Sequence, residues 1–236
     1  LQPLGPGPHP VLIYLHGGAF AIGSKRTHRA LAAAYASRGY LVCNVDYRLA
    51  PQQPFPAALE DACRAWQWAA DRVADFRGDP RRMALAGESA GANLALSVVL
   101  ACCTPRPEPY AAPLFELGVR PVAALLYCGF LQTCGPARYR RAGVSRLVSR
   151  VITDAARSYL GPSAEHPGPD QALADPLCVV ESMVAPARLP PLFVAAGLND
   201  PVLNDSQRLE QALLRAHSPC SAHYYHGEPH AFHVLF

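Results

Sequence analysis

Short apolar runs that favour strands alternate along this chain with longer runs at helical spacing, and no other feature constrains the fold as strongly. Strands separated by helices pair in parallel through right-handed crossovers, with the helices on both faces of the sheet. We therefore predict an α/β fold with a mostly parallel sheet. The predicted strands are Val11–Leu15, Leu41–Val45, Met83–Ala86, Val122–Tyr127, Leu192–Ala196 and Ala222–Tyr225. The predicted helices are Thr27–Arg38, Ala57–Arg72, Ala90–Cys103 and Ser206–His217.

One interval interrupts this alternation. Residues 129–190 contain an arginine-rich helical piece, RYRRAGVSRLVSRVITDAARSYL, before the next clear strand. Structureless loops of that length are uncommon inside compact domains, so we predict a cap or lid excursion from a single domain spanning residues 1–236. Its arginines indicate either an anion site or, as we prefer, a solvated helix face. They are Arg138, Arg140, Arg141, Arg146 and Arg150.

Charge and cysteine content narrow the classes of function. The net charge of +3 gives no reason to expect nucleic acid as a partner. The longest nearly apolar run, residues 92–103, is too short and too polar to span a bilayer. The eight cysteines form no CxxC pair, so we expect reduced, buried thiols and, from them, a cytoplasmic setting.

The segment LAGESAGANLAL, residues 85–96, carries the pattern G-x-S-x-G between a predicted strand and a predicted helix. A serine on such a tight strand-to-helix turn is held in a strained conformation that exposes its hydroxyl group. The glycines on either side leave room for the turn. Ser89 is therefore the candidate nucleophile.

The first predicted strand leads into LIYLHGGAFAIG, residues 12–23, where three glycines surround one histidine. Attack by a serine on an ester carbonyl places negative charge on oxygen, and a glycine-rich loop can present main-chain N–H groups to it at close range. We predict Gly18 and Ala19 as donors from this loop, joined by Ala90, with Gly17 keeping the turn open. His16 is predicted to brace the loop by hydrogen bonds.

A nucleophilic serine needs a base and an acid that orients the base, and in this architecture they follow in the order acid, then histidine. Asp200 follows the fifth predicted strand closely and is the preferred acid. Asp205 is expected to cap the next helix, and Asp175 in the excursion is a weaker alternative. Among His226, His230 and His233, the loop position favours His230. Three histidines in eight residues can also indicate a metal, but no carboxylate or cysteine set completes such a site by spacing, so none is predicted.

Five blocks of the chain together resemble the hormone-sensitive-lipase-like family of α/β-hydrolases, also called bacterial esterase family IV. The resemblance covers nearly the whole chain from Pro10 onward. The blocks are HGGAF…G (16–23), DYRLAPQQPFPAALED (46–61), GESAGAN (87–93), GLNDPVLND (197–205) and HAF (230–232).

This resemblance implies a serine carboxylesterase that needs no metal or organic cofactor. It implies Ser89 as nucleophile, Asp200 as orienting acid and His230 as base, with an oxyanion held by N–H groups of Gly18, Ala19 and Ala90. Glu88, before the serine, is expected to give structural support. Asp46, Tyr47 and Arg48 are expected to form scaffold around the glycine-rich loop.

The sequence departs from the family pattern in three places. Ala19 stands where a third glycine is frequent, which is harmless if only its N–H is used. Members usually carry a cap and two strands before the HGG strand and a helix after the catalytic histidine, and we expect these to be absent here. The chain is then either a segment of a longer protein or a reduced hydrolase with an uncovered sheet edge. Such an edge favours pairing, so a homodimer is one expected assembly.

The predicted function is hydrolysis of small carboxylic esters, with short to medium acyl chains, through an acyl-serine intermediate. Two alternatives stay open at this point: a non-catalytic homologue that binds a small molecule, and an amide or formamide hydrolase.

Overall fold

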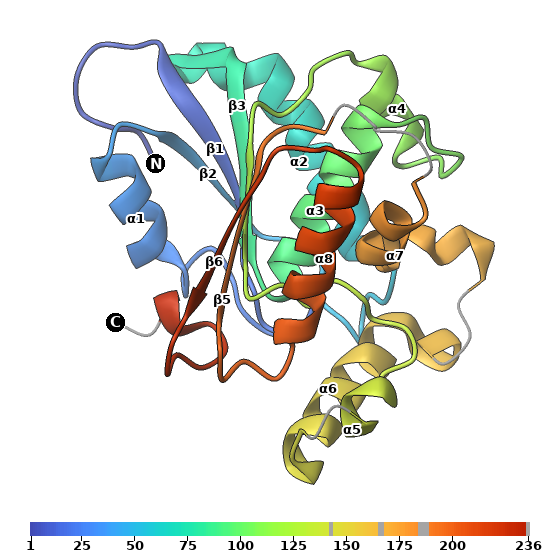
Figure 1. Ribbon diagram of the computed structural model, residues 1–236. Helices are drawn as coiled ribbons and strands as arrows, with labels where there is room; N and C mark the ends of the chain where they lie inside the picture. The colour runs from blue at the N-terminus through green and yellow to red at the C-terminus, as the bar shows by residue number, and fades with distance from the viewer. Residues whose placement is uncertain (142–143, 165–167, 184–188, 235–236) are drawn as a thin grey trace.

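The computed structural model describes residues 1–141, 144–164, 168–183 and 189–234. Six parallel strands form one sheet in the order β2-β1-β3-β4-β5-β6 (Figure 1). The predicted parallel α/β architecture is confirmed. The strands are β1 (His9–Leu15), β2 (Leu41–Val45), β3 (Gly78–Glu88), β4 (Ala124–Tyr127), β5 (Leu192–Gly197) and β6 (Cys220–Tyr225).

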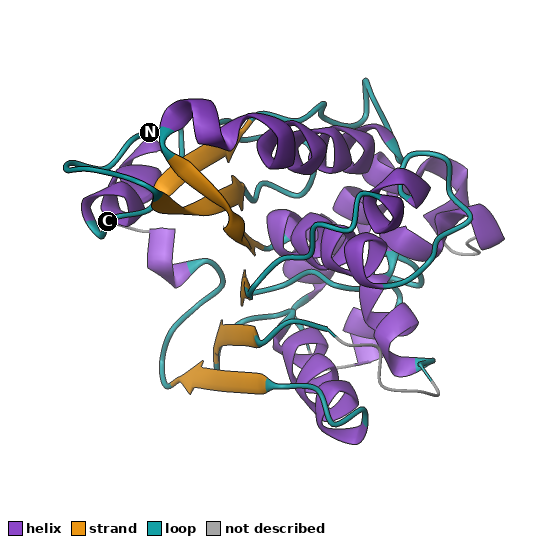
Figure 2. Ribbon diagram, turned by 90° about the horizontal axis from the view of Figure 1, so that it is seen from above, coloured by secondary structure: helices purple, strands orange, loops and turns teal. Residues whose placement is uncertain are grey.

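Helices cover the two faces of this sheet unequally. The helix α1 (Arg29–Ser37) packs on one face, where Ala32 and Ala36 meet the side chains of Leu12 and Tyr14. On the other face lie α2 (Ala57–Arg72), α3 (Ala90–Cys103) and α8 (Leu203–Arg215), as Figures 1 and 2 show. The shorter helices are α4 (Ala112–Glu116), α5 (Arg138–Arg141), α6 (Arg146–Leu160) and α7 (Pro176–Glu181), with 3-10 turns at Val73–Phe76, Gly161–Ala164, Pro169–Ala174 and Phe232–Val234.

The helix α3 lies at the centre of the larger core. All of its residues are buried, because it is enclosed by the sheet on one side and by α2, α4 and α7 on the others. Gly91 permits the close approach to the sheet, since a Cβ built there would stand 2.0 Å from the carbonyl oxygen of Leu15. This contact brings the start of α3 directly against the end of β1.

The interval 129–190, predicted as an excursion, contains α5, α6, α7 and two of the 3-10 turns among its described residues. In Figure 1, α5 and α6 project below the sheet, away from α2 and α3. Tyr159, near the end of α6, is buried and stacks on Phe20 with ring centroids 3.6 Å apart. The main-chain N–H of Phe55 donates to the carbonyl of Tyr159 at 2.7 Å. These contacts fix α6 beside the loop that follows β1.

Candidate active site

Ser89 joins β3 to α3 with φ 52° and ψ −115°. A positive φ is rare for residues other than glycine, and strain of this kind concentrates where function requires it. Ser89 N–H donates to the carbonyl of Tyr127 at 2.9 Å, so β4 holds the turn from the side. The result is a hydroxyl group that stands above the carboxyl end of the sheet.

His230 lies between Ser89 and Asp200. Its Nε2 is 2.9 Å from Oγ of Ser89, and its Nδ1 is 2.9 Å from Oδ1 of Asp200. The Asp200 side chain has no exposed surface, whereas a third of the His230 side chain is exposed. The main-chain N–H of Val202 also donates to Asp200 Oδ1, at 2.8 Å. Asp200 and His230 can thus orient one another while His230 faces the serine.

The loops after β5 and β6 are bonded to each other, which explains how residues 30 positions apart come together. The N–H of Asn199 donates to the carbonyl of Glu228 at 3.1 Å. Nδ2 of Asn199 donates to the carbonyl of Gly227 at 3.0 Å. Gly197 is closely covered as well, because a Cβ there would lie 2.0 Å from the Glu228 carbonyl oxygen.

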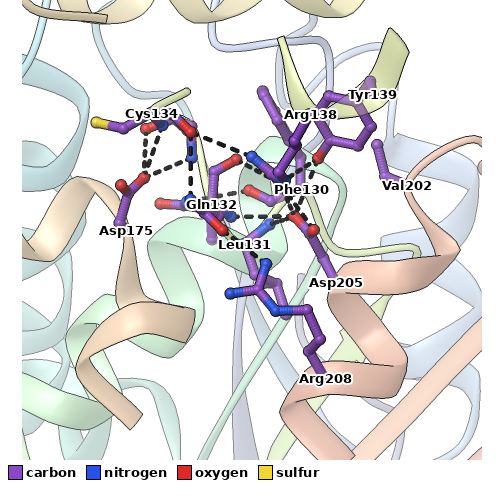
Figure 3. Close-up of polar contacts among 12 residues, drawn as sticks. Phe130, Leu131, Gln132, Cys134, Arg138, Tyr139, Asp175, Val202, Asp205 and Arg208 are labelled. Atoms are coloured by element: carbon purple, nitrogen blue, oxygen red, sulfur yellow. Dashed lines mark hydrogen bonds and ion pairs between the residues drawn. The ribbon is translucent and has the colours of Figure 1, made fainter. Parts of the chain in front are cut away.

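The interpretation of Asp205 as a helix cap is wrong. Val202 occupies the N-cap position of α8, and Asp205 lies inside its first turn, completely buried. Its Oδ1 is 2.8 Å from the Arg138 guanidinium, and its Oδ2 accepts the N–H groups of Leu131 and Gln132 (Figure 3). Arg138 is therefore paired and does not belong to a solvated helix face. This ion pair holds the chain after β4 onto α8.

Asp175 binds the chain segment after β4 as well, at Thr133 and Cys134. Its Oδ1 accepts hydrogen bonds from the N–H groups of Thr133 and Cys134 and from the Thr133 hydroxyl (Figure 3). Neither Asp205 nor Asp175 contacts His230. Of the three candidate acids, the structure brings only Asp200 to the histidine.

The other two histidines of the C-terminal loop lie elsewhere. His226 is exposed at the end of β6. His233 stacks on Tyr127 with ring centroids 4.5 Å apart, and neither of its ring nitrogens has a hydrogen-bond partner among the described residues. Burial lowers the pKa of His233 to about 4, with the charges of His230 and His28 acting in the same direction.

In the loop after β1, one main-chain N–H group is hydrogen-bonded within the protein and two others have no acceptor. Gly17 N–H donates to Oε1 of Glu88 at 2.5 Å, so it serves to hold the loop. No acceptor within the described part of the chain takes the N–H groups of Gly18 and Ala19. Gly18 has φ 116°, and a Cβ there would lie 2.1 Å from the Ile22 carbonyl oxygen. Ala90 is the first residue of α3, where an N–H has no acceptor within the helix.

His16 braces this loop as predicted. It is buried, and its Nδ1 lies 2.7 Å from the carbonyl oxygen of Gly17. Its ring stacks on that of Tyr47 at 4.2 Å, and the Tyr47 hydroxyl donates to the His16 carbonyl at 2.6 Å. Arg48 is bound by Asp61 and Glu60 of α2, which anchors the neighbouring scaffold segment.

Glu88 makes more contacts than the sequence indicated. Besides Gly17 N–H, it accepts the hydroxyl of Tyr14, and Nε2 of His28 stands 2.8 Å from its Oε1. Burial raises the pKa of Glu88 to about 8, and burial lowers the pKa of His28. His28 Nε2 and Glu88 Oε1 are therefore close enough to share one proton. The G-x-S-x-G pattern allows any residue at the position of Glu88, so it does not predict the contacts with Tyr14, Gly17 and His28.

A cavity of about 600 Å³ opens onto Ser89 and His230. One wall comes from α6, whose contributing positions have the i, i+3, i+4, i+7 spacing of a single helix face. These positions are Val148, Val151, Ile152 and Ala155. The opposite walls include Gly18, Ala19 and Phe130. An apolar group can therefore lie beside the serine hydroxyl.

One cluster within the described residues has donors suited to a metal ion: Cys128, Asp200 and His230. Sequence spacing did not reveal it, because the three residues follow three different strands. All eight cysteines are free thiols. None of the helices in the described part of the chain is both long and apolar enough to cross a bilayer.

Known proteins resemble this chain over most of its length. The family model of the alpha/beta hydrolase fold matches residues 12–234. An acetyl-hydrolase of Streptomyces hygroscopicus is 32% identical over 227 residues, which are 94% of this chain and 67% of that protein. The carboxylic ester hydrolase LipN of Mycobacterium tuberculosis is 33% identical over 241 residues, covering all of this chain and 60% of LipN. The chain thus spans roughly two thirds of the length of these relatives.

Solved esterase structures share the architecture. A bacterial heroin esterase superposes with a TM-score of 0.80 at 26% identity, over 96% of this chain and 68% of that one. A hyperthermophilic esterase from the archaeon Pyrobaculum calidifontis also gives a TM-score of 0.80 at 26% identity, over 100% of this chain and 74% of that one.

Proposed function

This chain belongs to the hormone-sensitive-lipase-like family of α/β-hydrolases, and from that premise we propose that it hydrolyses small carboxylic esters through an acyl-serine intermediate. The observation that carries the proposal is the position of His230, 2.9 Å from both Ser89 Oγ and Asp200 Oδ1. Proteins that match most of the chain are named as an acetyl-hydrolase, a carboxylic ester hydrolase and an esterase, which favours the same chemistry.

In the proposed acylation step, Ser89 Oγ attacks the ester carbonyl carbon while His230 Nε2 takes the hydroxyl proton. Asp200 keeps the other imidazole proton on Nδ1 and stabilises the positive charge that develops on the ring. His230 then gives its proton to the departing alkoxide, and the C–O bond of the ester breaks. In deacylation, His230 removes a proton from water, which attacks the acyl carbon. His230 then returns that proton to Ser89 Oγ as the bond to the acyl group breaks and the acid leaves.

The negative charge on the carbonyl oxygen is held by the N–H groups of Gly18, Ala19 and Ala90. These groups have no partner within the described structure, and preorganised donors of this kind are the largest single contribution in many hydrolases. Gly17 acts indirectly, since its N–H is committed to Glu88. We therefore assign Gly17 to loop position rather than to charge stabilisation.

The cavity limits the substrate class. Its α6 wall is apolar and fixed to the site by the Tyr159–Phe20 stack, so the acyl group of a short or medium ester fits beside Ser89. On this proposal residues 129–190 act as a cap, and the side chains of α6 that line the cavity select the substrate. The binding partner of the protein is a small-molecule ester.

The setting and the assembly are also proposals. The free thiols, several of them fully buried, favour a reducing, cytoplasmic compartment. The outer strand β6 provides a sheet edge through which two copies can pair, whereas the middle of β2 is already bonded to Leu1 through Val42. Light scattering after size-exclusion chromatography distinguishes a homodimer from a monomer.

The function is tested with p-nitrophenyl acetate, butyrate and octanoate. We expect turnover, a burst of p-nitrophenol and covalent labelling of Ser89 by an organophosphate. Ser89→Ala is expected to lose about 10⁴-fold or more in kcat, whereas Ser37→Ala on the exposed side of α1 keeps the parent rate. A Ser89→Ala protein as fast as the parent contradicts the proposal. Thermal stabilisation by esters without hydrolysis favours the binding homologue, and release of amine from amides favours the amidase.

A further inference from the structure

Cys128 stands directly beside the acid and the base of the proposed site. It follows β4, has φ 49° and has no exposed surface. Its N–H donates to the carbonyl of Ala195 in β5 at 2.7 Å, which fixes the residue against the strand that leads to Asp200. Potential ligand atoms of Cys128, Asp200 and His230 all lie within 4.8 Å of one another.

We propose that Cys128, Asp200 and His230 form a binding site for a thiophilic divalent cation, Zn²⁺ above all, and that the bound ion switches the hydrolase off. The inhibitory part of this inference rests on the proposed function. The binding part rests only on the donors.

The donor set selects the class of ion. A thiolate, an imidazole nitrogen and a carboxylate oxygen suit Zn²⁺ or its substitute Co²⁺, whereas Mg²⁺ and Ca²⁺ prefer oxygen ligands alone. Bond lengths of roughly 2.0–2.3 Å around Zn²⁺ place ligand atoms about 3.2–3.7 Å apart. Nδ1 of His230 and Oδ1 of Asp200, 2.9 Å apart, have to separate slightly, whereas donors near the 4.8 Å limit have to approach by about 1 Å. Water supplies the fourth ligand.

The carboxylate has an unused oxygen. Oδ1 of Asp200 accepts from His230 and from Val202 N–H, whereas Oδ2 has no N–H or hydroxyl donor in the described part of the chain, and the Cys128 thiol is a weak donor to this carboxylate. The side chain is fully buried, so bulk water does not solvate this oxygen. A buried carboxylate oxygen without a strong donor is costly. A cation at this position removes that cost.

Cys128 is a free, fully buried thiol beside the acid and the base. Metal ions bind the thiolate, so binding must release the thiol proton to solvent. The sulfur–metal bond then replaces the S–H bond, and one proton appears in solution for each ion bound at this sulfur.

Metal binding at Nδ1 of His230 prevents base catalysis. The neutral imidazole carries one proton, which in the free site sits on Nδ1 and points to Asp200. When Nδ1 donates its lone pair to the ion, that proton must sit on Nε2 instead. Nε2 then has no lone pair with which to accept the proton of Ser89. The ion and the ester reaction therefore exclude one another.

The ion can reach these residues through the substrate cavity. His230, Ala231 and Pro201 line it, and a third of the His230 side chain is exposed. Cys128 and Asp200 lie just beneath this ring. We expect the ion to reach them when the imidazole rotates away.

Metal binding is tested first without any reference to catalysis. Co²⁺ is titrated into the Ser89→Ala protein, and the thiolate-to-cobalt charge-transfer band in the near ultraviolet is recorded. We expect the band and release of one proton per ion, and loss of both in proteins that also carry Cys128→Ser or His230→Ala. The His230→Ala change keeps the thiol and removes a partly exposed ring, so it does not depend on tolerance of a core substitution. A band of parent intensity and affinity in either variant overturns the site.

Inhibition is tested on the active chain. Zn²⁺ is expected to stop ester hydrolysis reversibly, with recovery on EDTA, and Cys128→Ser is expected to raise the half-inhibitory concentration by at least about 10-fold. Cys178→Ser is the matched control, because Cys178 is also a free thiol whose pKa is raised by burial and by the charge of Asp175. Equal Zn²⁺ sensitivity of the Cys128→Ser and parent proteins overturns the switch. Failure of ester turnover in the metal-free parent contradicts the proposed function and leaves the cobalt result to decide the site.

Discussion

Gly17 N–H donates to Oε1 of Glu88 at 2.5 Å, and this bond ties the loop after β1 to the residue that precedes Ser89. Glu88 is buried and also holds the hydroxyl of Tyr14 and the ring of His28. One carboxyl group therefore sets the separation between the serine and the N–H groups proposed to receive the oxyanion.

Removing the Glu88 acceptor is expected to loosen this loop. Glu88→Ala should lower kcat by about 100-fold, with a smaller change in KM, because the N–H donors are displaced from the developing charge. Glu88→Gln retains an oxygen for Gly17 N–H and should recover most of kcat. Steady-state kinetics with p-nitrophenyl butyrate measure both. Equal losses in the two variants contradict a positioning role through Gly17.

The same residue predicts an alkaline limit to activity. Because burial raises the pKa of Glu88 to about 8, the carboxyl is neutral below that pH and negatively charged above it. A charge next to Ser89 opposes the oxyanion, so kcat should fall as pH rises through about 8. Glu88→Gln cannot ionise and should lack this limb. A kcat–pH profile shows it directly, and an identical alkaline fall in the Gln variant rules out Glu88 as its source.

The Asp205–Arg138 pair predicts a large structural effect. Asp205→Ala leaves the guanidinium and the N–H groups of Leu131 and Gln132 without their acceptor in a buried place. The free energy of unfolding should drop by about 3–5 kcal/mol, as measured by urea denaturation. Asp154→Ala removes an exposed pair with Arg150 and should cost at most about 1 kcal/mol. A similar decrease in the free energy of unfolding in both variants contradicts this prediction.

His233 predicts a loss of stability in acid. Its pKa falls from 6.5 to about 4 on folding, so the unfolded chain binds the proton more readily. The stabilising contribution is complete above pH 6.5 and disappears as pH falls through about 4. His233→Phe keeps the ring stack on Tyr127 and should be more stable than the parent by roughly 1–2 kcal/mol at pH 5. Unfolding curves at pH 5 and pH 8 make the comparison; an unchanged pH dependence excludes His233.

The apolar face of α6 predicts chain-length specificity. Ile152→Trp fills the cavity beside Ser89 and should reduce kcat/KM for octanoate by about 10-fold or more relative to acetate. Leu147→Trp is the control, since Leu147 lies on the same helix but is 75% exposed and does not line the cavity. A parallel shift in both variants indicates that α6 does not contact the acyl group.

Sequence patterns predicted the elements that have strong periodicity. The bounds of β2, α2 and α3 agree to the residue, because buried faces and a glycine-rich turn mark their ends. By contrast, α4 and α7 are too short for a helical repeat to show and were not predicted. β3 begins at Gly78 rather than Met83, since its early residues pair with His9 of β1 across a break in register.

Site residues could be predicted from the sequence where their position directly after a strand marks them. Ser89, Asp200 and His230 each follow a strand, and that position identifies them in the sequence. The role of Asp205 has no local signal, because its partner, Arg138, lies 67 residues earlier in the chain. The contacts of Glu88 with His28, and the place of Cys128, depend in the same way on which strands become neighbours in the sheet.

The hydrogen bonds between the loops after β5 and β6 make the acid and the base a single mechanical unit. Ser89 belongs to a different unit, carried by β3 and α3. The seam between them runs along β4 and β5, which pair over only four residues. Alignment of nucleophile and base therefore depends on that short ladder together with the Asp205–Arg138 pair, which ties the chain after β4 to α8. Heating that separates β4 from β5 should therefore stop ester hydrolysis while His230 and Asp200 still contact each other.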